Sequence, residues 1–382
     1  MVSSLEYGGA QRQIVELANH IDRDRFDLHI CSLSPHVPLA EVLVGAESRL
    51  HIVHKRWRYD LTVIPRLARL LRRLGADIVH GYLFDAEIAA RLAGRLAGTR
   101  AVGNSERNAD YRMPRVMLYA NAATRRCVDF YVANSQTGAR FSQQALRNPA
   151  HWYYTVHNGV DTERFRPAER SAARRALGLA DDEFVIGMVG SFKQQKNHAL
   201  LFETLRRVLD EQPRTRLLLV GDELVVGLHG SGGYKRRMLA LAGRLGLSRH
   251  ILATGNRVDM EALYPACDVT VLPSLFEGTP NVALESMACG VPVVATAVSD
   301  NAYVVRDGET GYVVPLGDPA LFCERLLALA QDPELRSRLG AAARRRIEEE
   351  FSSARLAAKT EAVYLDVLGR PSPEAARLRS FT

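Results

Sequence analysis

The sequence predicts an α/β protein with two doubly wound domains built on parallel sheets. Its 382 residues exceed the ~250–300 at which a single hydrophobic core stops growing, so two domains are expected. Short runs rich in Val, Ile and Leu alternate with longer amphipathic segments, which is the pattern of parallel strands joined by helical crossovers. Hydrophobic residues make up 47% and charged residues 24% of the chain, which excludes a disordered or fibrous protein.

Nine short runs have the composition of strands that are buried on both faces. They are residues 28–33, 77–80, 101–104, 130–133, 185–189, 217–220, 251–254, 269–272 and 291–295. Apolar residues recur at helical spacing in several segments between and after these runs. The predicted helices are residues 11–20, 64–74, 86–96, 199–209 and 352–368.

A domain boundary is expected near residues 158–182. The turn sequence Asn158-Gly159 is followed by a polar stretch before the next set of apolar runs begins. The expected parts are an N-terminal domain at 1–165, a second domain at 166–350, and a C-terminal helix with a frayed tail at 351–382.

The start of the first domain is unusual. Gly8-Gly9 resembles a tight turn between a first strand and a first helix, yet only seven residues precede it. A strand typically needs ~5–6 residues, and Ser3-Ser4 is not strand-like, so the first strand is expected to be short or missing. A truncated chain or a misassigned start codon would produce this pattern.

The net charge of +7 raises nucleic acid and anionic membranes as partners. No nucleic-acid-binding signature accompanies the charge, so nucleic acid is not expected as a partner. The five cysteines are scattered, without metal-ligand spacing, which indicates reduced thiols in a cytoplasmic protein. The sequence shows neither a run of ~18 apolar residues nor a signal-peptide pattern.

The most informative stretch is residues 269–296, in which a buried strand, a loop, a helix and a second strand follow one another. Thr279 is predicted as the helix N-cap and Pro280 as the first helical residue, and Gly290 ends the helix. A helix that begins at the carboxyl end of a parallel strand presents backbone N–H groups and the positive end of its dipole. The stretch therefore predicts an anion-binding site.

Two glutamates flank the start of this helix, Glu277 before it and Glu285 inside it. A carboxylate beside an anion site is unfavourable unless it has another task, such as accepting hydrogen bonds from sugar hydroxyls. With a rise of ~1.5 Å per residue, Glu285 would reach a ribose while a diphosphate stays at the helix tip. The alternative interpretation is that both glutamates are solvated surface residues.

A second phosphate-binding element is predicted at residues 189–198, a loop between a strand and a helix. It contains Lys193 and Lys196, and the whole chain has only five lysines. Such lysines can neutralise a diphosphate leaving group. The alternative is two ordinary loop lysines.

With these motifs in order, the whole chain resembles the retaining nucleotide-sugar glycosyltransferases of family 4, which have the GT-B architecture. Glu277 and Glu285 match the E-x7-E motif of that family. Further matches in order are His157-Asn158-Gly159-Val160-Asp161, Val220-Gly221-Asp222, Ala266-Cys267-Asp268, Leu272-Pro273-Ser274, residues 287–296 and Asp307-Gly308-Glu309-Thr310-Gly311.

The resemblance implies two Rossmann-like domains facing across a cleft, with the donor bound by the second domain and the acceptor by the first. The last helix would cross back onto the first domain. Glu277 would contact the donor sugar at the reacting centre, Glu285 the ribose hydroxyls, and Lys196 the diphosphate. The other donor-binding residues implied are Gly9, Gly190, Lys193, Arg257, Gly278, Thr279, Pro280, Asn281 and Val282.

The sequence departs from the family pattern in two places. Ser191 stands where family members usually carry Arg, and Lys193 is taken to replace that charge. Tyr82 and Asp85 occupy positions where histidine is frequent, and Asp85 is the candidate for a catalytic role. His80 has two interpretations, a histidine at the reacting centre or a core histidine at a strand end.

The expected reaction moves a sugar from a UDP- or GDP-sugar to an acceptor hydroxyl, with retention, in the synthesis of surface polysaccharide or glycolipid. No cofactor and no metal are expected, because Asp22-Arg23-Asp24 has the composition of a local turn. The acceptor would be a glycan or a lipid-linked glycan.

The Arg-rich predicted helix at 64–74 allows an anionic membrane surface as a further partner, with the protein peripheral on the inner face. The alternative for this segment is an ordinary surface helix. The alternative functions are an epimerase or phosphorylase of the same fold, and a pseudo-transferase without turnover.

Overall fold

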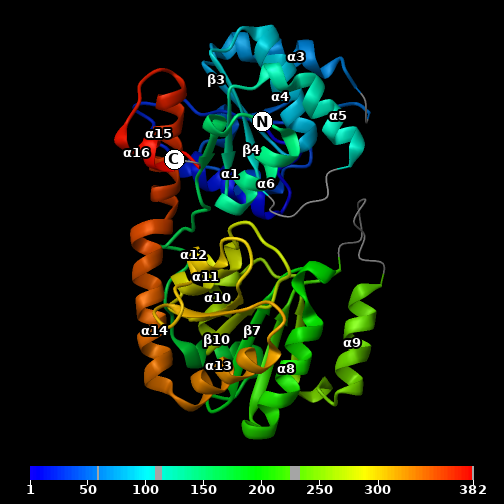
Figure 1. The fold of residues 1–382 in the computed structure, drawn as a ribbon, viewed down its shortest axis with the longest axis vertical. Coiled ribbons are helices and arrows are strands. Elements are labelled where there is room, and N and C mark those ends of the chain that lie inside the picture. The colour runs from blue at the N-terminus through cyan, green and yellow to red at the C-terminus, as the bar shows by residue number, and fades with distance from the viewer. Residues whose placement is uncertain (58–59, 108–113, 224–232, 381–382) are drawn as a thin grey trace. The chain divides into compact units, whose positions relative to one another are not determined.

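The computed structural model describes residues 1–57, 60–107, 114–223 and 233–380. The chain forms two compact units, shown in Figure 1: unit 1 is Met1–Gly159 with Ser353–Thr382, and unit 2 is Val160–Ser352. The chain passes from one unit to the other after Gly159 and again after Ser352. The boundaries expected from the sequence, at 165 and 350, lie a few residues from these two points. Each unit is described by itself below.

Unit 1 is built on parallel strands. β3 (Ile78–Tyr82), β4 (Ala101–Glu106), β5 (Phe130–Ala133) and β6 (Tyr153–Thr155) form one sheet in that order. β1 (Ile30–Ser32) and β2 (Leu50–Ile52) form a second pair. β2 and β6 were not predicted, because their sequences, Leu50-His51-Ile52 and Tyr153-Tyr154-Thr155, are not continuous runs of Val, Ile and Leu.

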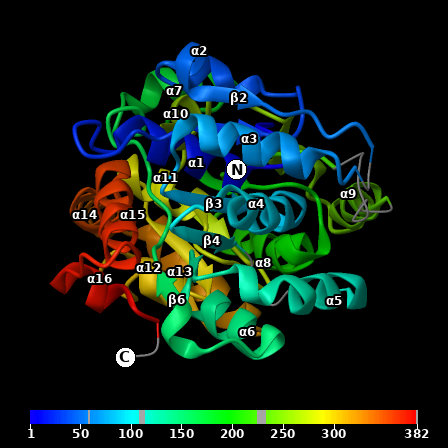
Figure 2. The same ribbon diagram turned by 90° about the horizontal axis from the view of Figure 1, so that it is seen from above.

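Helices cover both faces of these strands. They are α1 (Gly9–His20), α2 (Ala46–Arg49), α3 (Val63–Leu74), α4 (Phe84–Ala97), α5 (Arg115–Thr124), α6 (Gln136–Leu146), α15 (Ser353–Val367) and α16 (Pro373–Leu378). Figure 2 shows α3 and α4 beside each other over β3, and these two helices contact each other closely. α15 returns to unit 1 and packs its Val363 and Tyr364 with Leu17 of α1 and with Ile21, which follows α1 directly.

The expectation of a frayed tail after Gly369 is wrong. Ser372 caps α16 by accepting from the N–H of Ala375 at 3.1 Å, and Pro373 occupies its first turn. The backbone N–H of Ser380 then donates to the carbonyl of Tyr153 at 3.0 Å. The Pro/Arg-rich composition hid a capped helix that is held against β6.

The first strand of unit 1 is reduced to a bridge at Val2, which pairs in parallel with Ser32 of β1 and with Tyr82 of β3. Val2 is fully buried. This observation agrees with the expectation of a short first strand. Within the described residues, Val2 joins the two groups of strands.

Unit 2 contains one six-stranded parallel sheet. The strands are β7 (Phe184–Val189), β8 (Thr215–Val220), β9 (Ile251–Gly255), β10 (Val269–Leu272), β11 (Val293–Thr296) and β12 (Gly311–Val314). Their order in the sheet is β12-β11-β10-β7-β8-β9, so the order reverses between β7 and β10. Only β12 was not predicted, because it lies directly after a sequence rich in turn residues.

The helices of unit 2 lie on both faces of this sheet. They are α7 (Arg170–Leu177), α8 (His198–Glu211), α9 (Tyr234–Arg244), α10 (Met260–Leu263), α11 (Asn281–Ala288), α12 (Asn301–Val304), α13 (Pro319–Gln331) and α14 (Pro333–Arg346). Alternate residues of one strand enter different cores: Val185 of β7 packs in one and Ile186 in the other. The strands are therefore buried on both faces, which explains their nearly continuous apolar runs.

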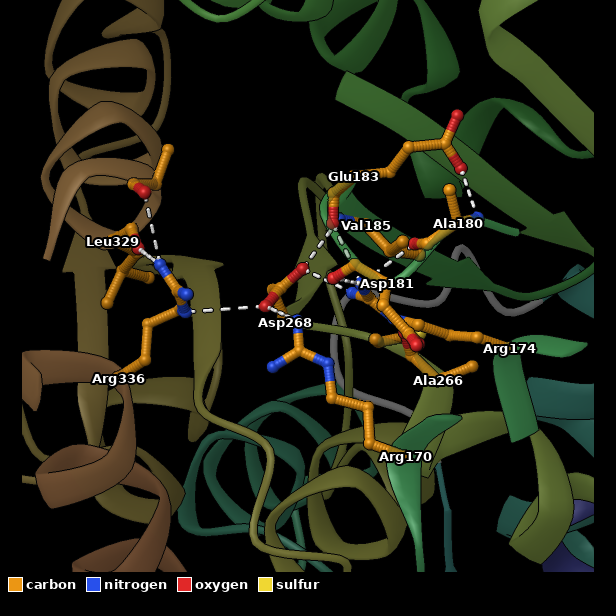
Figure 3. Close-up of polar contacts among 12 residues, drawn as sticks. Arg170, Arg174, Ala180, Asp181, Glu183, Val185, Ala266, Asp268, Leu329 and Arg336 are labelled. Atoms are coloured by element: carbon orange, nitrogen blue, oxygen red, sulfur yellow. Dashed lines mark hydrogen bonds and ion pairs between the residues drawn. The ribbon is translucent and has the colours of Figure 1, made fainter. Parts of the chain in front are cut away.

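A buried carboxylate, Asp268, ties the amino ends of β7 and β10 to the helices around them (Figure 3). Its side chain is 1% exposed and accepts from the N–H of Val185 at 2.7 Å. Arg174 of α7 donates to it at 2.7 Å, Arg170 also binds it, and Arg336 of α14 lies 3.3 Å away. Arg174 is itself fully buried, and Asp268 is its carboxylate partner.

We predict that Asp268→Asn lowers the free energy of unfolding by about 3–5 kcal/mol, because it leaves the buried Arg174 without its counter-charge. The matched control is Asp210→Asn, which removes an exposed ion pair with Arg206 on α8. It is expected to change stability by less than ~0.5 kcal/mol. Denaturant unfolding followed by circular dichroism measures both, and equal effects would contradict the prediction.

Candidate functional site

The predicted phosphate loops lie at the point where the strand order of unit 2 reverses. One loop follows β7 and the other follows β10, and these two strands are neighbours in the sheet. The connections leave them in opposite directions, so this is the switch point of the sheet topology. In open α/β sheets, ligands bind at this position.

Three contacts join the two loops. The backbone N–H of Leu275 donates to the carbonyl of Gln195 at 2.8 Å, and the Gln195 side chain donates to the carbonyl of Phe276 at 2.7 Å. Lys196 Nζ lies 2.5 Å from Glu277 Oε1. The structure therefore brings Lys196 and Glu277 into contact, as parts of one site.

The carboxylate of Glu277 is held from several sides. Its Oε1 accepts from Ser274 Oγ at 2.7 Å as well as from Lys196, and its own N–H donates to Ser299 Oγ at 3.0 Å. Glu277 and Glu285 are each 8% exposed, so the interpretation as solvated surface residues is wrong for both. The sequence analysis included Ser274 in the Leu272-Pro273-Ser274 match but assigned it no function. No feature of the sequence pointed to Ser299.

The two lysines give this loop a concentrated positive charge. Burial lowers the pKa of Lys193, and the nearby positive charge of Lys196 lowers it further, while Glu277 opposes the shift. Two ammonium groups in the same loop therefore face one carboxylate. An anion bound here would relieve the repulsion between them.

Glycines allow the loops to approach one another closely. Gly190 donates its N–H to the carbonyl of Val220 at 2.9 Å, and Gly221 donates to the carbonyl of Gly255 at 2.8 Å. Gly221 has a φ of 132°, and a Cβ there would lie 2.2 Å from the carbonyl oxygen of Gly190. The Val220-Gly221-Asp222 motif thus has a steric reason for its glycine.

Helix α11 begins at Asn281, one residue later than expected. Pro280 is the N-cap in an extended conformation, not the first helical residue, and its carbonyl accepts from the N–H groups of Ala283 and Leu284. Thr279 is therefore not the N-cap, although it is buried beside Gly278 at the end of the loop. The first turn, with Asn281 and Val282, directs its positive dipole end at the loop that carries Glu277.

Glu285 lies inside α11 and is anchored by Tyr264, whose hydroxyl donates to Glu285 Oε2 at 2.7 Å. Burial raises the pKa of Tyr264, and the carboxylate of Glu285 raises it further, so the phenol keeps its proton and remains a donor. Tyr264 was not among the residues predicted from the sequence. It is 21 residues from Glu285, and this separation matches no motif in the sequence.

Arg257 follows β9 and has a different environment. Its guanidinium donates to both carboxylate oxygens of Asp259, at 2.8 and 2.5 Å. Hydrogen bonding and charge together raise the pKa of Arg257 and lower that of Asp259. Within the described part of the chain, the structure places Arg257 in this exposed pair and not in the contacts around Lys196 and Glu277.

The two predicted site residues of unit 1 are Gly9, which begins α1, and Asp85, in the first turn of α4. The side chain of Asp85 is 56% exposed and lies 3.4 Å from Lys55 Nζ. Tyr82, the other residue at a family histidine position, is buried beneath the guanidinium of Arg107, 4.8 Å from its ring. Of these two positions, Asp85 is the one that is open to solvent.

His80 is a core histidine. Its Nδ1 lies 2.9 Å from the hydroxyl of Tyr364 and its Nε2 lies 3.0 Å from Ser105 Oγ. Burial holds the pKa of His80 well below its usual range, so the ring is neutral at neutral pH. It links α15 to β3 and β4 and has a structural role.

The structure describes neither a metal-binding cluster nor a membrane-spanning helix in the residues that it covers. Among these residues, no group of three or more His, Cys, Asp or Glu side chains could hold a metal ion. In the same residues, no helix is long and apolar enough to cross a membrane.

Known proteins resemble this chain in sequence and in fold. Residues 7–164 match the family model "Glycosyltransferase Family 4", and residues 169–346 match "Glycosyl transferases group 1". Each half of the chain is therefore similar to a glycosyltransferase domain.

Individual relatives either match this chain over only part of their length or match it at low sequence identity. The chain is 39% identical over 217 residues to "D-inositol 3-phosphate glycosyltransferase" of Streptomyces bingchenggensis, covering 56% of this chain and 47% of that protein. The chain thus spans about half the length of this relative. It is 25% identical over 318 residues to "N-acetyl-alpha-D-glucosaminyl L-malate synthase" of Bacillus anthracis, covering 81% and 80% of the two chains.

Among solved structures, the Anabaena HepE complex with UDP has a TM-score of 0.82 at 20% identity, covering 96% of this chain and 98% of that chain. The HepE complex with UDP-glucose also gives 0.82 at 20% identity, covering 94% and 97%. At this identity the likeness concerns the fold. The predicted fold class, two parallel-sheet α/β domains of the GT-B type, is confirmed.

We predict that Gly221→Ala destabilises unit 2 by about 1–3 kcal/mol, because the new Cβ would overlap the Gly190 carbonyl at a φ that side chains rarely adopt. Gly243→Ala in α9 is the control, since the nearest atom to its new Cβ is 4.0 Å away. It is expected to be neutral or to stabilise by ~0.5–1 kcal/mol. Urea unfolding measures both, and a harmless Gly221→Ala would refute the steric argument.

Proposed function

We propose that this protein transfers a sugar from a UDP-sugar to an acceptor hydroxyl with retention of configuration. The observation that carries the proposal is the contact between Lys196 and Glu277 where the strand order reverses. It puts a cation for the leaving group next to a hydrogen-bond acceptor for the sugar. UDP is favoured over GDP because the similar HepE structures are complexes with UDP and with UDP-glucose.

The proposed role of Lys196 is to stabilise the departing diphosphate. Its ammonium has three N–H donors, and one of them is directed at Glu277, so two remain for phosphate oxygens. Lys193, the backbone at Gly190 and the first turn of α11 add positive potential at the same place. Negative charge grows on the diphosphate in the transition state, which is where such preorganised donors contribute most.

The two glutamates would bind different parts of the donor. Glu277, at the loop, would accept from a sugar hydroxyl next to the reacting carbon. Glu285 lies about 6 Å further along the axis from the first residue of α11, in the direction of a ribose. Tyr264 and Ser274 would keep the two carboxylates in place while the donor binds.

Asp85 is proposed as the polar residue that unit 1 contributes to the reacting centre, in place of a family histidine. Gly9 and Arg257 are proposed as further donor contacts. Transfer is proposed to proceed without a metal ion, since the lysines and the helix terminus supply positive charge. Full turnover in the presence of EDTA would support this point.

We predict that Lys196→Met and Glu277→Gln each lower kcat for UDP-sugar turnover by about 10²–10³-fold. The chemically matched control is Glu309→Gln, which removes an exposed partner of Arg306 and should leave kcat unchanged. Thermal unfolding with UDP, GDP and ADP supplies the binding measurement. A nucleotide at 100 times its Kd should add about 2.7 kcal/mol of stability.

The alternatives predict different products from the same enzyme preparation. Epimerised or hydrolysed UDP-sugar without any acceptor would indicate an epimerase, and phosphate-dependent glucan cleavage would indicate a phosphorylase. Nucleotide binding without turnover, unaltered by Glu277→Gln, would indicate a pseudo-transferase. Each of these results would overturn the proposed transfer reaction.

The acceptor is proposed to be a glycan or lipid-linked glycan of the cell surface, presented at the cytoplasmic leaflet. α3 carries the exposed Arg69, Arg72 and Arg73, and the exposed apolar side chains of Trp57 and Leu61 precede it. Basic side chains with Trp and Leu beside them are typical of a surface that docks on anionic lipid.

We predict that replacing Arg69, Arg72 and Arg73 by Gln lowers binding to phosphatidylglycerol-containing vesicles at least ~10-fold, since each charge contributes about 1 kcal/mol. The control replaces the exposed Arg236, Arg237 and Arg244 of α9 by Gln, which removes the same charge elsewhere. Vesicle co-sedimentation measures both. Equal losses in the two variants would mean that net charge, and not α3, determines binding.

A further inference from the structure

Positive φ angles are rare at residues other than glycine, and they mark backbone strain where no local reason explains them. In the described ranges, the residues of this kind are Leu83, Arg147, Asn197 and Ser299. Leu83 precedes α4, Arg147 ends α6 as many helices end, and asparagine tolerates this conformation well. Ser299 is neither an asparagine nor a helix end, and with a φ of 48° it lies after β11 in unit 2.

Ser299 is the first central residue of a tight turn. The N–H of Asn301 donates to the carbonyl of Val298 at 3.0 Å, which closes the turn. The second central residue, Asp300, has a φ of −94° and a ψ of 20°. A turn with positive φ at its first central residue normally has glycine there. The backbone therefore favours glycine at this position, and a serine needs a compensating contact.

The side chain of Ser299 makes such a contact with the loop that carries Glu277. Its Oγ accepts from the backbone N–H of Glu277 at 3.0 Å, across 22 residues of sequence. The carbonyl of the same peptide group, which belongs to Phe276, accepts from the Gln195 side chain at 2.7 Å. One peptide plane is thus held from two sides, by the loop after β7 and by the turn after β11.

The turn is itself attached to the sheet. Asn301 is fully buried, and its side chain donates to the carbonyl of Thr296, the last residue of β11, at 3.0 Å. Thr296 Oγ1 donates to the carbonyl of Ser274 at 2.6 Å, in the loop that carries Glu277. The turn and that loop are therefore fixed to the same strand end, which sets the position of Ser299 relative to Glu277.

The direction of the 276–277 peptide determines where the carboxylate of Glu277 points. Among the described residues, Ser274 and Lys196 both contact Oε1, which leaves Oε2 for a sugar hydroxyl. If the peptide rotated, the Glu277 side chain would move with it and lose its contact with Lys196. A displacement of ~1 Å near a reacting centre can cost about 10²-fold in rate.

We propose that Ser299 is a positioning residue that acts through Glu277. Its left-handed backbone places Oγ within reach of the Glu277 N–H, and this hydrogen bond fixes the peptide and hence the carboxylate at the reacting centre. Glycine would relieve the strain but has no acceptor, so the strained serine is the residue that performs this task. The proposal rests on the proposed function, because a transfer reaction gives Glu277 a sugar to contact.

Two substitutions separate positioning from stability. Ser299→Gly removes the acceptor and relieves the strain, whereas Ser299→Ala removes the acceptor and keeps the strain. We expect the Tm of Ser299→Gly to stay within ~2 °C of the wild type and that of Ser299→Ala to fall by about 2–4 °C. Both should lower kcat for the release of UDP from UDP-glucose by about 10–100-fold.

Binding of UDP should not change in either variant, because the lysine loop and the first turn of α11 stay in place. Calorimetry with UDP measures this. The matched control is Arg147→Gly, which relieves a φ of 52° at the exposed end of α6. Its Tm should be no lower than that of the wild type and its kcat unchanged. A wild-type kcat in Ser299→Gly, or a kcat that falls only where the Tm falls, would overturn the proposal.

A double-mutant cycle tests whether Ser299 acts through Glu277. In the Glu277→Gln background, Ser299→Gly should lower kcat further by less than ~2-fold, because the positioned group has already been removed. Equal losses in the two backgrounds would show that Ser299 acts by another route and would contradict the proposal.

A crystal structure of Ser299→Gly distinguishes a failure of this proposal from a failure of the proposed function. We expect a reoriented 276–277 peptide and a Glu277 carboxylate beyond hydrogen-bonding distance of Lys196. If the wild type releases no UDP from UDP-glucose, the proposed function fails, and this structure still decides the role of Ser299. An unchanged contact between Lys196 and Glu277 would refute that role.

Discussion

The candidate site depends on the reversal of strand order between β7 and β10. Lys196 and Glu277 are 81 residues apart, and their contact exists because the two loops leave neighbouring parallel strands in opposite directions. A sheet whose strands followed one another in sequence order would separate these loops by several strand widths. The topology thus brings two distant motifs together in one candidate site.

The same pair of strands is fixed at its other end by Asp268. That carboxylate precedes β10, accepts from Val185 at the start of β7, and gathers arginines from α7 and α14. β7 and β10 are therefore held at their amino ends by buried charge and joined at their carboxyl ends by Lys196 and Glu277. This arrangement lets short loops hold charged side chains within hydrogen-bonding distance, as preorganised electrostatic stabilisation requires.

Unit 1 uses polar contacts for a different purpose. His80, Tyr364 and Ser105 form a buried chain that anchors the returning C-terminal helix to the sheet. The Rossmann-like domain is thus completed by a segment from the far end of the chain.

The sequence by itself determined the α/β class and most strands, and it singled out the helix after β10 and the two side chains that the structure brings into contact, Lys196 and Glu277. Buried parallel strands are continuous apolar runs, and phosphate loops need glycine and lysine, so both leave a local signal. The three-residue strands β2 and β6 and the tail helix α16 were missed because they are held by partners that are distant in the sequence. The start of α11 lies one residue later than expected. Only the tertiary structure decided that Ser274 and Ser299 hold Glu277, that Tyr264 holds Glu285, and that His80 belongs to the core, because these contacts join residues whose spacing in the sequence carries no pattern.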